Sequence, residues 1–112
     1  MSKLQKDAAG NLYPDIVGKF GTSQTITAGA TSLQSTAFGQ ETTLIRIATT
    51  NLTGSGAHVT VAIGANPTAT TNDVMIPCGL ITYAVVSPGD KIAVLRGAST
   101  NIDVSITEIT NA

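Results

Sequence analysis

The sequence predicts an all-β protein: one antiparallel β-sandwich, of jelly-roll or immunoglobulin-like type, with an extended N-terminal arm. Val, Ile and Thr make up 37 of the 112 residues, and β-branched side chains favour strands over helices. From residue 22 onward, short apolar runs recur every 8 to 14 residues between Gly, Pro, Asn and Ser, the spacing of a sandwich or barrel. A chain of 112 residues fits one core, so we expect an arm over residues 1–22 and one domain over 23–112.

The arm contains glycines and a proline and keeps no strand or helix period. It nevertheless carries more apolar side chains than a solvated tail normally has. It therefore either packs over one end of its own domain or lies on a neighbouring subunit or larger partner. The residues we assign to the capsid or neighbour contact are Leu12, Tyr13, Ile16, Val17 and Phe20.

Eight strands are predicted, over residues 24–28, 33–38, 43–50, 58–63, 73–77, 80–87, 91–96 and 102–109. The fourth and eighth alternate apolar and polar residues, as in Val59, Val61 and Ile63 against Thr60 and Ala62. This period of two is typical of a strand with one buried face.

The sixth strand is apolar on both faces. Ile81, Tyr83 and Val85 share one face, and Leu80, Ala84 and Val86 share the other. The seventh strand has a weaker form of the same pattern. A strand in a two-layer sandwich has one core face, so the second face is expected under a loop or in a subunit interface. We expect self-association through Leu80, Ala84, Val86 and Leu95.

The segment Ser87-Pro88-Gly89-Asp90 has Pro and Gly at the two central positions that a type II turn requires. We expect it to form a tight hairpin between the two apolar strands.

Candidate chemical sites are sparse. His58 is the only histidine and is expected to be a surface or strand-edge residue, and Cys78 is expected to act as a small hydrophobe. Asp90 is expected to serve the turn and Glu108 to be a solvated strand residue. The acids Asp73, Asp90, Asp103 and Glu108 could meet at one end of a sandwich and bind calcium, but their spacing does not encode a calcium loop. The sequence predicts neither an enzyme nor a cofactor.

Charged residues are only 12% of the chain and the net charge is -1, so nucleic acid and anionic lipid are not expected as partners. No apolar run has the length of a membrane-spanning helix or a signal peptide. We expect a protein that is not exported through a signal peptide. The 18 threonines supply a neutral surface that can pair with other chains at little desolvation cost.

The second half of the chain resembles small head decoration, or cement, proteins of tailed bacteriophages. The resemblance covers about residues 58–109 and rests on the order of VTVAIGANPTA (59–69), MIPCG (75–79), VSPGDKIAVL (86–95) and VSITE (104–108). It implies a β-sandwich or barrel, and because such proteins often form trimers we expect this chain to form a homotrimer. It also implies a place on the outer face of the virion capsid, where the protein binds the major capsid protein and clamps adjacent shell subunits after synthesis in the host cytoplasm.

Two other functions remain as alternatives. The first is a receptor- or carbohydrate-binding module of a phage fibre or tail tip, which usually exposes aromatic rings, whereas this chain has only two Tyr and two Phe. The second is a small hydrolase with a calcium or carboxylate site, for which the sequence offers no constellation.

Overall fold

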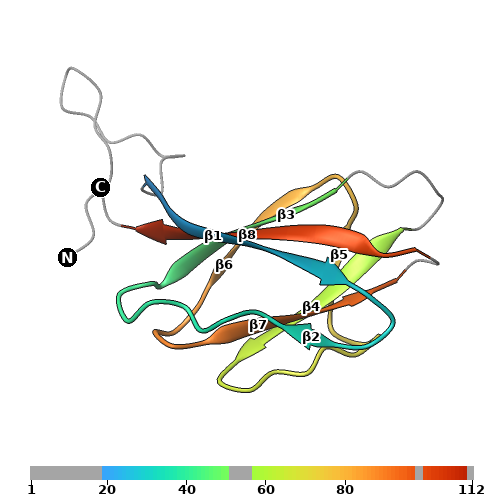
Figure 1. The fold of residues 1–112 in the computed structure, drawn as a ribbon, viewed down its shortest axis with the longest axis horizontal. Coiled ribbons are helices and arrows are strands. Elements are labelled where there is room, and N and C mark those ends of the chain that lie inside the picture. The colour runs from blue at the N-terminus through green and yellow to red at the C-terminus, as the bar shows by residue number, and fades with distance from the viewer. Residues whose placement is uncertain (1–18, 51–56, 98–99, 111–112) are drawn as a thin grey trace.

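The computed structural model contains two four-stranded antiparallel sheets packed face to face, as predicted for a β-sandwich (Figure 1). It describes residues 19–50, 57–97 and 100–110. Sheet 1 has the strand order β1-β8-β3-β6 and sheet 2 the order β2-β7-β4-β5. The strands are β1 (Lys19–Ala28), β2 (Leu33–Gln34), β3 (Leu44–Thr49), β4 (His58–Gly64), β5 (Val74–Pro77), β6 (Ile81–Val85), β7 (Lys91–Arg96) and β8 (Ile102–Thr110).

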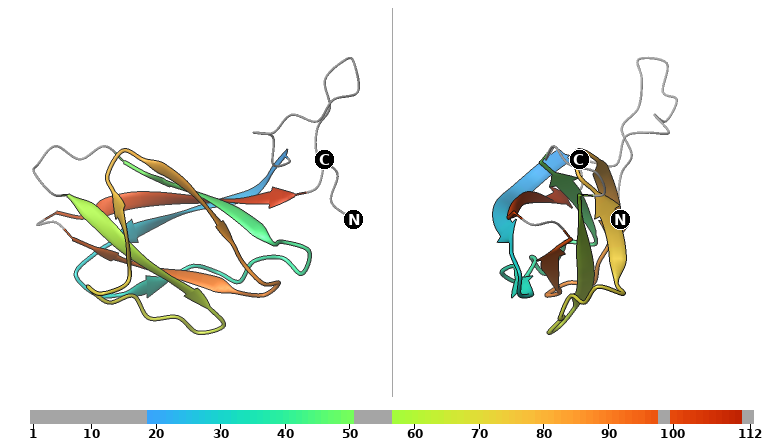
Figure 2. Two further views of the ribbon diagram at one scale, coloured as in Figure 1. Left: turned by 180° about the vertical axis from the view of Figure 1, so that it is seen from behind. Right: turned by 90° about the vertical axis from the view of Figure 1, so that its right-hand side faces the viewer.

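The strand order identifies the sandwich as a jelly roll. The chain changes sheet at every connection except the one between β4 and β5, and the two layers that result are seen from two sides in Figure 2. Eight strands in this order form two interlocked Greek keys, whereas an immunoglobulin-like sandwich places its strands in a different order. Of the two alternatives that the sequence left open, the jelly roll is correct.

The core lies between the sheets and consists of the inward-facing apolar side chains of both. The inward faces predicted for β4 and β8 are confirmed, because Val59 and Val61 on β4 and Ile102, Val104 and Ile106 on β8 are all buried. The polar face of β4 is not solvated as predicted, because Thr60 is also buried, on a strand that lies between β7 and β5. The full cluster comprises Ile26, Ala28, Phe38, Ile45, Ile47, Val59, Val61, Ile76, Val86, Ile92, Val94, Ile102, Val104 and Ile106.

Two strands, β1 and β2, differ most in length from the prediction. β1 begins at Lys19, so residues 19–22, which the sequence places in the arm, are part of the sandwich. β2 contains only Leu33 and Gln34, although strand 33–38 was predicted. Main-chain bonds from Ser35 N–H to the Ile92 oxygen (2.8 Å) and from Phe38 N–H to the Asp90 oxygen (2.8 Å) hold the rest of that segment beside β7.

The turn from Ser87 to Asp90 has the predicted backbone conformation but does not form the predicted hairpin. Gly89 has a φ of 82°, as the third position of a type II turn requires, and Asp90 N–H donates to the Ser87 oxygen at 3.0 Å. The Asp90 carboxylate also accepts the Ser87 N–H at 2.9 Å, which confirms its turn role. However, β6 belongs to sheet 1 and β7 to sheet 2. The turn therefore joins the two sheets, and the expected hairpin is wrong.

Candidate interaction surface

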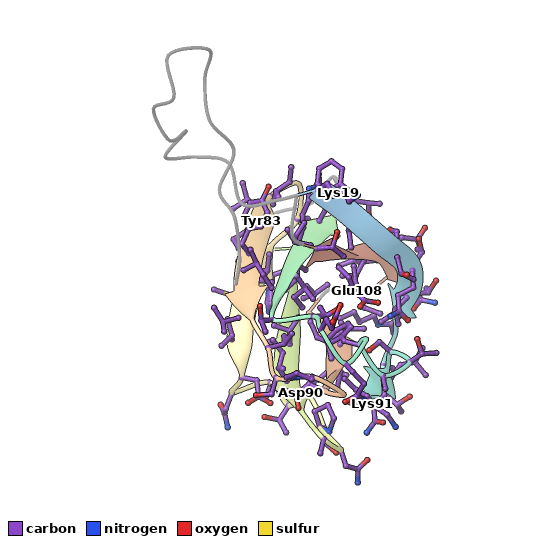
Figure 3. The ribbon with its side chains drawn as sticks, turned by 90° about the vertical axis from the view of Figure 1, so that its left-hand side faces the viewer. Lys19, Tyr83, Asp90, Lys91 and Glu108 are labelled. Carbon is purple, nitrogen blue, oxygen red and sulfur yellow. The ribbon has the colours of Figure 1, made fainter. Side chains whose placement is uncertain are left out.

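The outer face of β6 exposes three large apolar side chains, where an ordinary sandwich surface is polar. Ile81 is 55% exposed, Tyr83 49% and Val85 80%, and all three side chains leave sheet 1 on the side away from the core. Figure 3 shows the labelled Tyr83 at the rim of the molecule. β6 is also an edge strand, because among the described residues it pairs only with β3.

The two apolar faces of β6 are interchanged relative to the prediction. Val86 is 5% exposed and belongs to the core, and Ala84 packs against the core, so neither presents an outer surface. The register with β3 decides this, because Ala84 is opposite the buried Ile45. One clue in the sequence favoured the observed arrangement: a Tyr hydroxyl normally needs water or a partner, which favours exposure of the face that carries Tyr83.

The four residues predicted for self-association do not form one surface. Leu80 is exposed and lies directly before β6, in accord with an outer position. Leu95 is half-buried on β7, a central strand of sheet 2, opposite Thr60 of β4. Leu80 thus lies at the start of a strand of sheet 1 and Leu95 within sheet 2, whereas Val86 belongs to the core and Ala84 packs against it.

Of the residues predicted for the capsid or neighbour contact, Phe20 is described and is 68% exposed on β1. The Arg46 guanidinium carbon lies 5.8 Å from the centroid of its ring, a cation–π contact. The other four, Leu12, Tyr13, Ile16 and Val17, lie outside the described residues.

Phe20 and Val85 are the two ends of one row of apolar residues across the outer face of sheet 1. Phe20 is opposite Ile109, Ile109 is opposite Leu44, and Leu44 is opposite Val85. Cross-strand partners in an antiparallel sheet share a face, so the row spans all four strands. Its two ends are exposed, whereas Ile109 is buried and Leu44 half-buried.

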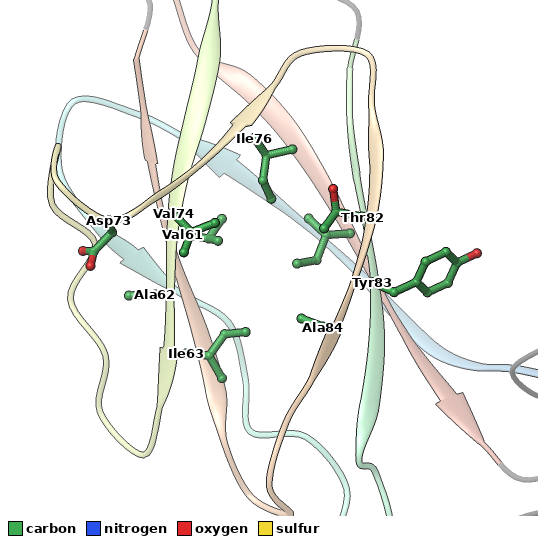
Figure 4. A pocket seen from close by; sticks show the side chains of 10 residues that line it. Val61, Ala62, Ile63, Asp73, Val74, Ile76, Thr82, Tyr83 and Ala84 are labelled. Atoms are coloured by element: carbon green, nitrogen blue, oxygen red, sulfur yellow. The ribbon is translucent and has the colours of Figure 1, made fainter.

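A pocket of about 420 Å³ opens between the free edges of the two sheets. Figure 4 shows its lining, with the labelled Thr82 and Ala84 of β6 on one side and Val61, Ile63, Val74 and Ile76 of β4 and β5 on the other. The Tyr83 ring points away from these side chains and outward. The lining is mainly aliphatic, so the pocket is suited to apolar side chains.

The environment of Glu108 differs most from the prediction made for the candidate site residues. It was expected to be solvated, but it is 8% exposed on the inner side of β8. Its carboxylate accepts hydrogen bonds from Gly39 N–H at 2.9 Å and from the Thr42 hydroxyl. Figure 3 shows the labelled Glu108 in the interior. Both donors belong to the β2–β3 connection, so the carboxylate anchors a loop.

The other candidate residues pack against neighbouring residues or form hydrogen bonds within the fold. His58 is half-buried at the start of β4, with its ring against Gly97, and Cys78 is half-buried against the core. The Asp73 carboxylate accepts the Thr70 N–H at 2.7 Å, and the Asp103 carboxylate accepts the Thr27 hydroxyl at 2.9 Å. Within residues 19–50, 57–97 and 100–110, no three His, Cys, Asp or Glu side chains are grouped as metal ligands would be.

Comparison with protein-family models, with curated proteins and with solved structures found no match. The part of the chain that the structure describes includes no helix with the length and hydropathy that crossing a membrane would need.

Proposed function

We propose that this chain is a structural virion protein, a capsid decoration or cement protein that binds the outer surface of a phage head and clamps neighbouring shell subunits. The major capsid protein is then its partner. The fold alone does not choose this function, because jelly rolls serve in viral capsid and in lectin domains. The proposal is supported by the sequence resemblance over residues 58–109 and by one surface of the sandwich.

The observation that carries the proposal is the apolar row on sheet 1 together with the apolar edge at β6. Exposed apolar side chains that are contiguous on a surface mark a protein contact. Here Ile81, Tyr83 and Val85 form such a stretch along the β6 edge. Phe20 is exposed separately at the other end of the row, beyond the half-buried Leu44 and the buried Ile109. Each Å² of apolar surface that a contact removes from water contributes roughly 25 cal/mol, before the cost of association is subtracted.

The N-terminal arm precedes this surface in the chain. The chain enters β1 at Lys19, next to Phe20, so the preceding apolar residues are covalently attached at the Phe20 end of the row. We assign Leu12, Tyr13, Ile16 and Val17, with Phe20, to the shell or neighbour contact. A clamp formed by an arm and a sandwich face would bind two neighbouring shell subunits at once, and many copies on one head would multiply the effect.

The test uses heads assembled from the major capsid protein of the same genome, without this chain. The full-length chain is added, the heads are sedimented, and the bound copies per head and the temperature of head disruption are measured. We expect binding that saturates at a fixed number of copies and a raised disruption temperature. Deletion of residues 1–18 leaves β1 intact and is expected to lower occupancy, and Phe20→Ala is expected to lower it less.

A matched control is Thr25→Ala, which changes an exposed residue farther along β1 and should leave occupancy unchanged. Absence of binding to the heads would contradict the proposal. If the soluble chain instead bound one glycan class reproducibly on an array, the receptor- or carbohydrate-binding alternative would replace it.

A further inference from the structure

The four edge strands of the sandwich are protected to different degrees. Exposed edges are normally blocked by charge, proline, bulges or short length. β1 carries Lys19 and a register shift between Phe20 and Ser23, β2 is two residues long, and β5 is four residues long and ends in Pro77. β6 has none of these devices: its sequence is Ile-Thr-Tyr-Ala-Val, and its register with β3 is regular.

The free hydrogen-bonding groups of β6 belong to the same residues that expose their side chains. Val86 N–H donates to the Thr43 oxygen at 2.9 Å, and Thr49 N–H donates to the Leu80 oxygen at 3.2 Å. Residues 80 and 86 therefore point their main-chain groups at β3. Because main-chain direction alternates along an antiparallel strand, the N–H and C=O groups that point away from β3 are those of Ile81, Tyr83 and Val85.

We propose that β6 pairs with β6 of a second copy, antiparallel, about a two-fold axis that passes beside Tyr83. This rests on the proposed function: it assigns the β6 edge of the apolar surface to self-association and leaves the Phe20 end of the row and the N-terminal arm for the shell. In the register that pairs all five residues, Tyr83 is opposite Tyr83 and Ile81 is opposite Val85. The free N–H and C=O groups of Ile81, Tyr83 and Val85 in one copy then face those of Val85, Tyr83 and Ile81 in the other. All of them can form hydrogen bonds between the two strands. The result is one eight-stranded sheet across two copies.

The second copy is favoured as the occupant because it matches the edge in charge and in shape. The occupant must be an uncharged extended strand with a free edge as long as that of β6. Among the described strands, β2 and β5 are also uncharged edge strands, but β2 has two residues and β5 has four and ends in Pro77, so β6 of a second copy fits best. The cation opposite β6 on β3 is Arg46, and its guanidinium lies against Phe20 on the side away from β6. The pairing edge itself carries no charged side chain, so two β6 strands can approach without like charges between them.

The pocket beside β6 supports the same pairing. It opens between β6 and β5 and is lined by Thr82 and Ala84. A second β6 would extend sheet 1 beyond its present edge, so that Thr82 and Ala84 of that copy lie over the open side. Apolar lining that now faces water would be covered, which adds to the burial of Ile81 and Val85 on the outer face.

Sedimentation of the full-length chain over a range of concentrations tests the pairing. We expect a species of twice the 11.4 kDa chain mass, whereas the trimer implied by the resemblance would have three times that mass. Tyr83→Lys and Val85→Lys place like charges on or near the axis and should weaken the dimer by about tenfold or more. Leu33→Lys, at an exposed apolar position on the edge strand β2, is the matched control and should leave it unchanged.

A disulfide tests the register. Hydrogen-bonded antiparallel partners have Cα atoms about 5.5 Å apart, within the range that a disulfide bridges. In a Cys78→Ala background, Tyr83→Cys is expected to form a covalent dimer on mild oxidation, and Thr25→Cys, exposed on β1, is not.

A chain that is monomeric at all concentrations, or trimeric and unaffected by Tyr83→Lys, would overturn the pairing. So would a monomer that loses head binding on Tyr83→Lys, because the edge would then belong to the shell. Each of these results leaves head decoration intact. Failure of a β6-paired dimer to bind heads would contradict the proposed function alone.

Discussion

The Glu108 carboxylate of β8 accepts the main-chain N–H of Gly39 at 2.9 Å, across 69 positions of the chain. It also accepts the Thr42 hydroxyl. The last strand thereby holds the connection from β2 to β3 at one end of the sandwich. A buried carboxylate is tolerated there because the protein supplies its donors.

Glu108→Ala should destabilise the fold because it leaves the Gly39 N–H and the Thr42 hydroxyl without their acceptor. The expected loss is about 1–3 kcal/mol in the free energy of unfolding, measured by urea denaturation. Glu108→Gln keeps an acceptor oxygen and should lose less. Glu41→Ala, at an exposed position in the same connection, is the control, and an equal loss for both alanine variants would refute the anchoring role.

Val85 and Val86 are adjacent in sequence, but Val85 is exposed and Val86 is buried. The same substitution at the two positions therefore tests which face of β6 lies in the core. Val86→Asp puts a charge without a partner into the core and should cost several kcal/mol, in the range of about 3–5. Val85→Asp changes a residue that is 80% exposed and should alter the melting of the monomer little. Thermal unfolding followed by circular dichroism distinguishes them. Comparable melting temperatures would mean that the faces of β6 are assigned incorrectly.

Gly97 is required because the His58 ring occupies the space of a side chain. A Cβ at position 97 would lie 2.1 Å from His58 Nε2, so Gly97→Ala must displace the ring, at a cost of about 1–3 kcal/mol. Once the ring has been removed by His58→Ala, the methyl group of Gly97→Ala has no ring to displace. Adding Gly97→Ala to the His58→Ala variant should therefore cost less stability than adding it to the wild type. Gly64→Ala is the control, since nothing lies within 4 Å of its Cβ. Denaturant midpoints of the four variants measure the coupling, and strict additivity would contradict it.

Gly89→Ala tests the turn between the sheets. The added Cβ would meet only Gln40 Nε2, at 3.6 Å, so the backbone φ of 82° is the main source of strain. A loss of about 1–2 kcal/mol is expected, and Gly89→Asn should lose less because Asn tolerates this conformation. Equal stability of the wild type and Gly89→Ala in urea would show that the turn relaxes without cost.

Short-range patterns in the chain were enough to predict the strands and the class of fold. The alternation of Val59, Val61 and Ile63 depends only on the period of a strand, and the Pro-Gly pair before Asp90 depends only on backbone dihedral angles. Both are properties of a few consecutive residues, so they can be recognised without knowledge of the rest of the molecule.

Which face of β6 is buried, and which strands are neighbours, depends on contacts between distant parts of the chain. A strand with apolar residues on both faces can bury either face in the core. The register with β3 decides which face is buried, because it places Ala84 opposite Ile45 and leaves Tyr83 outside. Glu108 was misassigned for the same reason, since its donors lie more than 60 positions away. Local periodicity therefore specifies which segments are strands, whereas long-range pairing determines which side chains remain in contact with water.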